Sequence, residues 1–304
     1  MKIYDCFTFY NEFELLELRL KALWDVVDYF VLVEADKTHN NKPKPFHFWE
    51  RQDDFKAFFP KIRHLPVEMD VPFNGAGDWS IENAQRDAII YALEDAAPDD
   101  LIFISDVDEL WLPNILERIQ NRRETLVALY PLPYCQPGGR QYKVHCELKI
   151  DAIDLLNICP IALNQIWHYY YFDWATEIQQ PTTIIVTRRN FTTPQKIRAL
   201  LHELPCITDG GHHFSYMGGV DRVIDKMTSI VEGPKLIERS GGKILDRKHV
   251  EAAMANGTDV YGRKGLPESK FVPFDARNIE LPHVDEFLRK YPHFLRETKK
   301  YFND

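Results

Sequence analysis

Two uninterrupted apolar runs constrain the fold most, because a strand tolerates such a sequence when both faces of its sheet are covered. They are residues 29–35 (YFVLVEA) and 101–105 (LIFIS). Strand-like runs also occupy residues 3–9 and 62–67, and helical periodicity separates all four at 12–24, 51–59 and 79–93. This alternation predicts an α/β fold with a mostly parallel, Rossmann-like sheet flanked by helices.

The pattern changes after Pro113. A short helix is expected at 115–119, and the later expected elements are strands at 126–132, 142–150 and 182–187, an aromatic segment at 165–174, and helices at 219–232 and 284–291. We therefore expect two joined halves, residues 1–130 and 131–304, with a boundary near Pro131.

Composition excludes several classes of protein. The 304-residue chain carries a net charge of −9, which disfavours nucleic-acid binding because phosphates need clustered Lys and Arg. Its five cysteines are odd in number and lack CxxC spacing, so we expect free thiols rather than a zinc site or a disulfide framework. No signal-peptide pattern follows Met1 and no apolar run approaches the ~20 residues of a membrane span, which predicts a soluble, cytoplasmic protein.

Asp106-Val107-Asp108 directly follows the run at 101–105, at a predicted strand end. Ligands of parallel α/β sheets bind beyond the carboxyl ends of the strands. Carboxylates at positions i and i+2 of such a turn can point to the same side, bind Mg²⁺ or Mn²⁺, and leave coordination positions open for diphosphate oxygens. Glu109 adds a third carboxylate.

Other strand ends and one helix supply candidate residues for a nucleotide pocket. Asn11 follows the first strand, and Glu34 at the end of the second can accept hydrogen bonds from a ribose or base; an exposed strand-end carboxylate is the simpler alternative for Glu34. Arg86 shares a helix face with Glu82, so it can pair with a phosphate, brace Asp106, or form only a helix ion pair.

An ordered set of motifs resembles glycosyltransferase family 17. The motifs are FYNE at 9–12, ELRL at 17–20, DVVDYFVLVEA at 25–35, KPKPF at 42–46, W-x-x-E-x-x-x-R at 79–86, DVDE at 106–109 and GHHFSY at 211–216. The resemblance extends over residues 3–232 and departs at His212, where the family more often has Trp.

The resemblance implies a GT-A fold, a Rossmann-like mixed sheet flanked by helices, whose first half binds a nucleotide sugar and whose appended second half binds the acceptor. It implies a UDP-sugar donor, with UDP-GlcNAc favoured, Mn²⁺ or Mg²⁺, and inversion at the anomeric carbon to give a β-linked product. It also implies a glycan or glycolipid acceptor, so that any membrane contact is peripheral and made through the acceptor. In GT-A enzymes a histidine of the second half often joins the metal shell. His213 is our candidate beside Asp106 and Asp108, and adjacent His212 is the alternative.

Inversion by direct displacement needs a general base for the acceptor hydroxyl. Asp173 lies among aromatic residues in YYYFDWATE, where burial would raise its pKa toward a usable value. Glu109, Glu177 and Asp209 compete with it for this role.

Two other functions fit parts of the pattern. A non-catalytic glycan-binding protein could use the aromatic cluster at 167–174, but intact carboxylates at 106–109 disfavour it. Haloacid-dehalogenase-type phosphatases also place DxD after an apolar strand, but they usually have Thr or Val where this chain has Leu110, and their motif tends to lie near the N-terminus.

Overall fold

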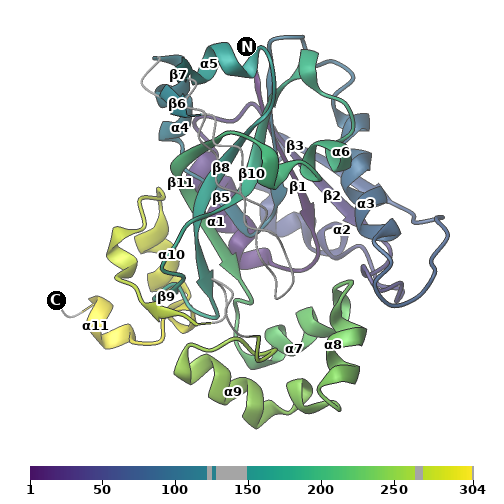
Figure 1. The fold of residues 1–304 in the computed structure, drawn as a ribbon, viewed down its shortest axis with the longest axis vertical. Helices are drawn as coiled ribbons and strands as arrows, with labels where there is room; N and C mark the ends of the chain where they lie inside the picture. Colours follow the sequence, from purple (N-terminus) through teal and green to yellow (C-terminus); the bar gives the residue numbers. More distant parts are fainter. Residues whose placement is uncertain (122–124, 128–148, 264–269, 303–304) are drawn as a thin grey trace.

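A computed structural model describes residues 1–121, 125–127, 149–263 and 270–302 (Figure 1). The expected boundary at Pro131 lies outside the described residues, as do Cys135 and Cys146. The three cysteines among the described residues, Cys6, Cys159 and Cys206, are free thiols.

The first part of the chain builds the parallel portion of a large sheet. Its strands are β1 (Ile3–Phe9), β2 (Tyr29–Ala35), β3 (Ile62–Val67) and β4 (Leu101–Asp106). β1 lies between β2 and β4, and β3 follows β2, with every pair parallel. Apart from partly covered Tyr29 and Asp106, the side chains of β1, β2 and β4 are buried, which explains their continuous apolar runs.

The second part of the chain makes the sheet mixed. Its strands are β5 (Glu109–Trp111), β8 (Ile161–Tyr169), β9 (Trp174–Ala175), β10 (Gln180–Thr187), β11 (Cys206–Ser215) and β12 (Val272–Pro273). β10 joins β4 and β8 in antiparallel fashion, so the sheet order is β12-β9-β8-β10-β4-β1-β2-β3. β11 pairs with β8 in parallel and with β5 in antiparallel fashion, and β6 (Thr125–Val127) pairs with β7 (Lys149–Asp151) in a separate small sheet. The expected α/β class, a mixed sheet with flanking helices, is confirmed.

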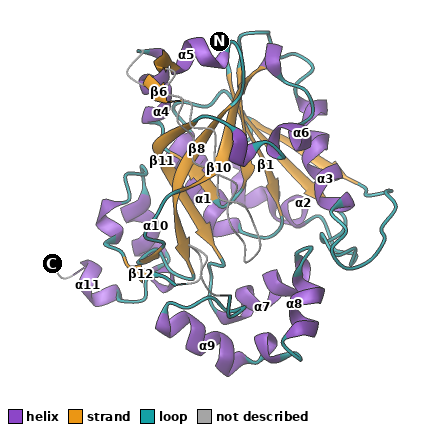
Figure 2. Cartoon of the chain, viewed as in Figure 1, coloured by secondary structure: helices purple, strands orange, loops and turns teal. Residues whose placement is uncertain are grey.

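Helices cover both faces of this sheet (Figure 2). Apolar residues of α1, α4 and α10 pack with one face, and those of α6 and the 3₁₀ segment at Ala88–Ala92 pack with the other. The helices are α1 (Phe13–Leu23), α2 (His47–Arg51), α3 (Ser80–Asp87), α4 (Asn114–Gln120), α5 (Ala152–Leu156), α6 (Pro194–Arg198), α7 (Val220–Ser229), α8 (Gly233–Arg239), α9 (Arg247–Asn256), α10 (Val284–Lys290) and α11 (Thr298–Phe302).

A separate group of helices, α7 to α9, lies at one end of the sheet, at the bottom of Figure 1. Val223 and Met227 of α7 and Val250 of α9 form an apolar cluster with Tyr169, at the end of β8. This cluster fixes α7 across the carboxyl ends of the parallel strands, where the predicted site lies. No helix in the described part of the chain has the length and apolar character to cross a bilayer.

Candidate active site

The turn from Asp106 to Glu109 connects β4 to β5. Asp106 lies beside Thr8 in the parallel ladder, and the amide of Val107 donates to the carbonyl oxygen of Thr8 at 3.1 Å. The Glu109 carboxylate closes the turn by accepting the amide of Asp106 at 2.9 Å. These two hydrogen bonds fix the backbone of the turn, and they thereby fix the positions from which the Asp106 and Asp108 side chains extend.

A buried arginine, Arg19 of α1, also holds the backbone of this turn. Its guanidinium donates to the carbonyl oxygens of Asp106 at 3.0 Å, Val107 at 3.3 Å and Glu109 at 2.9 Å. It also forms a two-point ion pair with Asp5 at 2.6 and 2.8 Å, and both side chains are fully buried. The sequence analysis does not identify Asp5 or Arg19 as a site residue. The available signal was a charged residue within an otherwise apolar strand, Asp5, and another on the apolar face of a helix, Arg19.

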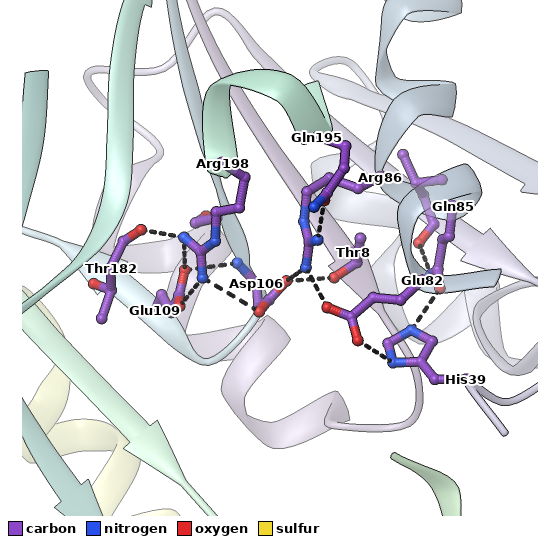
Figure 3. A network of polar contacts seen from close by, with 12 residues as sticks. Thr8, His39, Glu82, Gln85, Arg86, Asp106, Glu109, Thr182, Gln195 and Arg198 are labelled. Atoms are coloured by element: carbon purple, nitrogen blue, oxygen red, sulfur yellow. Dashed lines mark hydrogen bonds and ion pairs between the residues drawn. The ribbon is translucent and has the colours of Figure 1, made fainter. Parts of the chain in front are cut away.

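Two arginines surround the Asp106 carboxylate (Figure 3). Arg86 approaches Oδ1 at 3.2 Å and Arg198 approaches Oδ2 at 3.6 Å, while the Thr8 hydroxyl donates to Oδ1 at 2.8 Å. Burial alone would raise the pKa of Asp106, but the two guanidinium groups hold that pKa well below its usual range. Of the roles expected for Arg86, the structure shows the brace on Asp106 together with the helix ion pair to Glu82 at 2.9 Å.

The Asp108 carboxylate faces the second half of the chain. Lys226 of α7 donates to Oδ2 at 2.7 Å, and Nε2 of His213 lies 3.5 Å from Oδ1. Burial opposes ionisation, yet the Lys226 ammonium holds the pKa of Asp108 well below its usual range. The amide of Phe214 donates to the carbonyl oxygen of Asp108 at 2.8 Å, which ties β11 to the turn.

Strand alternation separates the two histidines of β11. His213 lies opposite Glu109 in the β5 ladder and opposite Trp167 in the β8 ladder, and its ring meets the Trp167 ring edge-on with centroids 4.7 Å apart. His212 points the other way and contacts Nε2 of His168 at 2.9 Å through its Nδ1. Burial lowers the pKa of His212 to about 4, so this ring is a neutral core residue.

A pocket of about 640 Å³ opens beside the turn. The sheet contributes Thr8, Asp106, Asp108 and His213, and α7 and α8 contribute the opposite wall. Six cationic side chains line it although the chain is acidic: Lys37, Lys44, Lys226, Lys235, Arg239 and Arg263.

The donors at this turn fit a divalent cation held by two protein ligands. Two ligands of one octahedral ion at ~2.1 Å lie about 3 Å apart, so the 3.5 Å between Oδ1 of Asp108 and Nε2 of His213 needs only a small closure. Among the described residues, Nδ1 of His213 is buried and has no hydrogen-bond partner. The described residues contain no group of three or more His, Cys, Asp or Glu side chains suited to a metal, so Asp106 does not complete a triad. Mg²⁺ commonly uses one or two carboxylates and takes its other ligands from water and substrate phosphates.

Three of the expected nucleotide contacts do not line this pocket: Arg86, described above, Glu34 and Asn11. Glu34 is fully buried, where its carboxylate accepts the Phe48 amide at 2.9 Å and lies 3.8 Å from Lys44, a pocket residue. Asn11 lines a smaller adjoining hollow, and its side-chain amide donates to Asp225 at 3.0 Å. Both residues therefore position neighbouring groups.

The expected general bases also lie apart from the pocket. Asp173 lines a separate hollow of about 250 Å³, and its carboxylate accepts the amides of Arg296 at 2.9 Å and Glu297 at 3.1 Å. Glu109 is buried and pairs with Arg198 at 2.5 Å. The competing residues Glu177 and Asp209 are exposed and do not line the large pocket either.

Glu232, which the sequence did not single out, is the remaining carboxylate of the pocket. The pocket's other acidic side chains each accept a hydrogen bond or ion pair: Glu12, Glu82, Asp106 and Asp108. Glu232 forms no ion pair among the described residues. Although the residue is exposed overall, partial desolvation in the pocket and then the nearby Glu82 carboxylate raise its pKa, while a hydrogen bond from its own backbone amide opposes this shift. Its place at the end of the predicted helix 219–232 was the one signal in the sequence.

Comparison with known proteins finds similarity in the segment that contains this turn. Residues 1–126 match the family model of glycosyltransferase family 17. The β-1,4-mannosyl-glycoprotein 4-β-N-acetylglucosaminyltransferases of Homo sapiens and Rattus norvegicus are each 35% identical over 108 residues, 33% of this chain. The match spans 20% of the length of these relatives.

Structural similarity to solved proteins is weak. A 4-diphosphocytidyl-2C-methyl-D-erythritol synthase aligns over 69% of this chain and 89% of its own, with a TM-score of 0.33 and 13% identity. A mannosyltransferase of Pyrobaculum calidifontis, in complex with GDP-Man and Mn²⁺, aligns over 86% of this chain and 77% of its own, with a TM-score of 0.31 and 14% identity. The sequence match is the informative comparison: the part of this chain that is similar to glycosyltransferase family 17, residues 1–126, includes the Asp106–Glu109 turn.

Proposed function

We propose that this protein transfers N-acetylglucosamine from UDP-GlcNAc to a hydroxyl group of a glycan or glycolipid, with inversion and formation of a β-glycosidic bond. One observation carries the proposal: the family-matched segment, residues 1–126, contains the Asp106–Glu109 turn, and that turn opens onto a pocket of about 640 Å³. The relatives named above are N-acetylglucosaminyltransferases, which supports the choice of sugar.

In this proposal the donor diphosphate lies beside Asp108 and Lys226. The Lys226 ammonium, 2.7 Å from Asp108, provides positive charge at the pocket wall. Asp106 is held by Arg86 and Arg198, so it stays ionised and can accept a hydrogen bond from the ribose. Bound at Asp108 and His213, Mn²⁺ or Mg²⁺ would offset the charge that develops on the leaving diphosphate.

We assign the general base to Glu232 in place of Asp173. As the acceptor oxygen attacks the anomeric carbon, Glu232 takes its proton, the bond from that carbon to the diphosphate breaks, and the electron pair leaves with UDP. Attack from the face opposite the diphosphate inverts the configuration. The raised pKa of Glu232 suits a group that must bind a proton during the reaction.

The test is a donor and acceptor screen. Purified protein with Mn²⁺ is incubated with UDP-GlcNAc, UDP-glucose, UDP-galactose or GDP-mannose and a panel of glycans, and nucleotide release and product mass are measured. We expect UDP-GlcNAc to give a product one N-acetylhexosamine heavier than the acceptor, and Asp108→Asn to abolish it. Asp246→Asn, at the N-terminus of α9, is the control for the substitution.

Three results would reject the proposal. Absence of UDP binding and turnover with every UDP-sugar would remove the donor. Glycan binding that needs neither metal nor nucleotide, without turnover, would favour the non-catalytic alternative. Release of phosphate from p-nitrophenyl phosphate that depends on Asp106 would favour a phosphatase.

A further inference from the structure

The two oxygens of the Asp108 carboxylate have different neighbours. Oδ2 accepts the Lys226 ammonium at 2.7 Å, and Oδ1 faces Nε2 of His213 at 3.5 Å. The ammonium therefore occupies one side of the carboxylate, while a gap suited to a cation lies on the other. Asp106, by contrast, already has Arg86 and Arg198 beside it, so its charge is compensated within the protein.

The position of Lys226 allows its ammonium group to move from Asp108 to another anion. Its side chain is 28% exposed whereas that of Asp108 is 6% exposed, and both residues line the pocket. The ammonium also lies 5.2 Å from the centre of the Tyr216 ring, whose face attracts a cation. The lysine has a flexible four-carbon stem and is a point charge, so it can pair with a phosphate as readily as with a carboxylate.

A divalent cation and the ammonium compete for the same carboxylate. With both present on Asp108, their like charges repel at short range in a partly buried site. A nucleotide diphosphate relieves this conflict, because it brings negative charge to the cation and offers Lys226 a second anionic partner.

We propose that Lys226 is an exchangeable counter-ion, which pairs with Asp108 in the empty protein and moves to the diphosphate when nucleotide and divalent cation enter together. This inference rests on the proposed function, since it requires a nucleotide diphosphate in the pocket. Its consequence is cooperative binding: the cation binds weakly alone and tightly with UDP. By linkage, the cation strengthens UDP binding by the same factor.

Titration calorimetry of the full chain tests the exchange, with Mn²⁺ alone, UDP alone, and each in the presence of the other. For the wild type we expect UDP to tighten Mn²⁺ binding at least tenfold. Lys226→Met keeps the length of the stem and removes the charge. It should tighten Mn²⁺ alone at least tenfold, weaken UDP alone at least tenfold, and lower the coupling factor, leaving only the part due to direct attraction between the cation and the diphosphate. Lys235→Met is the matched control, because it removes a charge from the same pocket without contacting Asp108; its affinity for Mn²⁺ alone should equal that of the wild type.

The outcomes separate this inference from the proposed function. If the wild type binds no UDP under any condition, the proposed function fails. If it binds UDP but Mn²⁺ has no effect on that binding, or if Lys226→Met keeps the wild-type Mn²⁺ affinity and coupling, only the exchange is overturned. Thermal unfolding of each variant shows that it is folded, and Lys226→Arg, which restores a positive charge, should recover the weak binding of Mn²⁺ alone.

Discussion

Arg19 offers the sharpest test of how the fold supports the site. Replacement by Met leaves the Asp5 carboxyl group fully buried without its counter-ion, with the indole N–H of Trp111 at 2.9 Å as its remaining hydrogen-bond partner among the described residues. Removing one member of a buried ion pair costs roughly 3 to 5 kcal/mol. The total stability of a protein is about 5 to 15 kcal/mol, so this one substitution would remove a large part of the free energy of unfolding.

The expected shift in Tm follows from the chain length. The entropy of unfolding is about 2.1 cal/mol/K per residue, so a loss of roughly 3 to 5 kcal/mol in a 304-residue chain lowers Tm by about 5 to 8 °C. Differential scanning calorimetry and urea unfolding measure these two quantities. Arg247→Met is the control, because the Arg247–Asp221 pair is exposed, with 58% and 82% of the side chains accessible, and such pairs contribute little.

A double variant separates stability from function. Adding Asp5→Asn to Arg19→Met removes the buried charge and should recover about 2 kcal/mol or more of the loss. It does not restore the donors to the carbonyl oxygens of Asp106, Val107 and Glu109, so UDP binding should stay at least tenfold weaker than in the wild type. The reasoning is refuted if Arg19→Met lowers stability by less than about 1 kcal/mol, or if the double variant binds UDP like the wild type.

Three further predictions concern single groups of the site. Glu232→Gln should lower turnover by about 10²-fold or more without weakening UDP binding. Because partial burial raises the pKa of Glu232, the kcat/KM of the wild type should rise with pH around a midpoint above 4.5, and this rise should be absent in the variant. His213→Ala should weaken Mn²⁺ binding in the presence of UDP by about tenfold or more, while His212→Ala should leave that affinity unchanged and lower Tm, as calorimetry and unfolding will show. Burial would raise the pKa of Glu82, but His39 helps to lower it from 4.5 to about 2. The ionised Glu82 therefore stabilises the fold fully above pH 4.5, and this stabilisation is lost as the pH falls toward 2. Glu82→Gln should flatten the plot of stability against pH in this range, and an unchanged plot would contradict the role given to Glu82.

The sequence was most informative where local pattern and burial coincide. The apolar runs at 29–35 and 101–105 became β2 and β4, and the motif at 106–108 lies at a carboxyl strand end as predicted. Local pattern cannot report which strand comes to lie beside another. The antiparallel insertion of β10 next to β4 was therefore not foreseen, although it is what brings the second half of the chain to the site.

Because local pattern does not report tertiary contacts, the general base expected from the sequence differs from the one proposed from the structure. Asp173 was chosen for its aromatic neighbours in the sequence, but its carboxylate accepts backbone amides in another hollow. Glu232 and Lys226 reach the pocket only because α7 crosses the strand ends, a tertiary contact with no local signature. His213 was chosen over His212 by resemblance, and strand alternation gives the physical reason for that preference.

The joining of β11 to the turn through β5 also bears on which mutations the protein can tolerate. The two histidines differ in the face to which they point because they occupy successive positions of β11. Inserting one residue between Gly211 and His212, beyond the register shift at 207–211, would therefore exchange their faces. His212 would then face Asp108, and His213 would enter the core beside His168. Gly211 permits little compensation, because an added Cβ there would lie 2.2 Å from the carbonyl oxygen of Leu110. Homologous sequences are therefore expected to vary in residue type along this strand while its length from the glycine to the histidine stays constant.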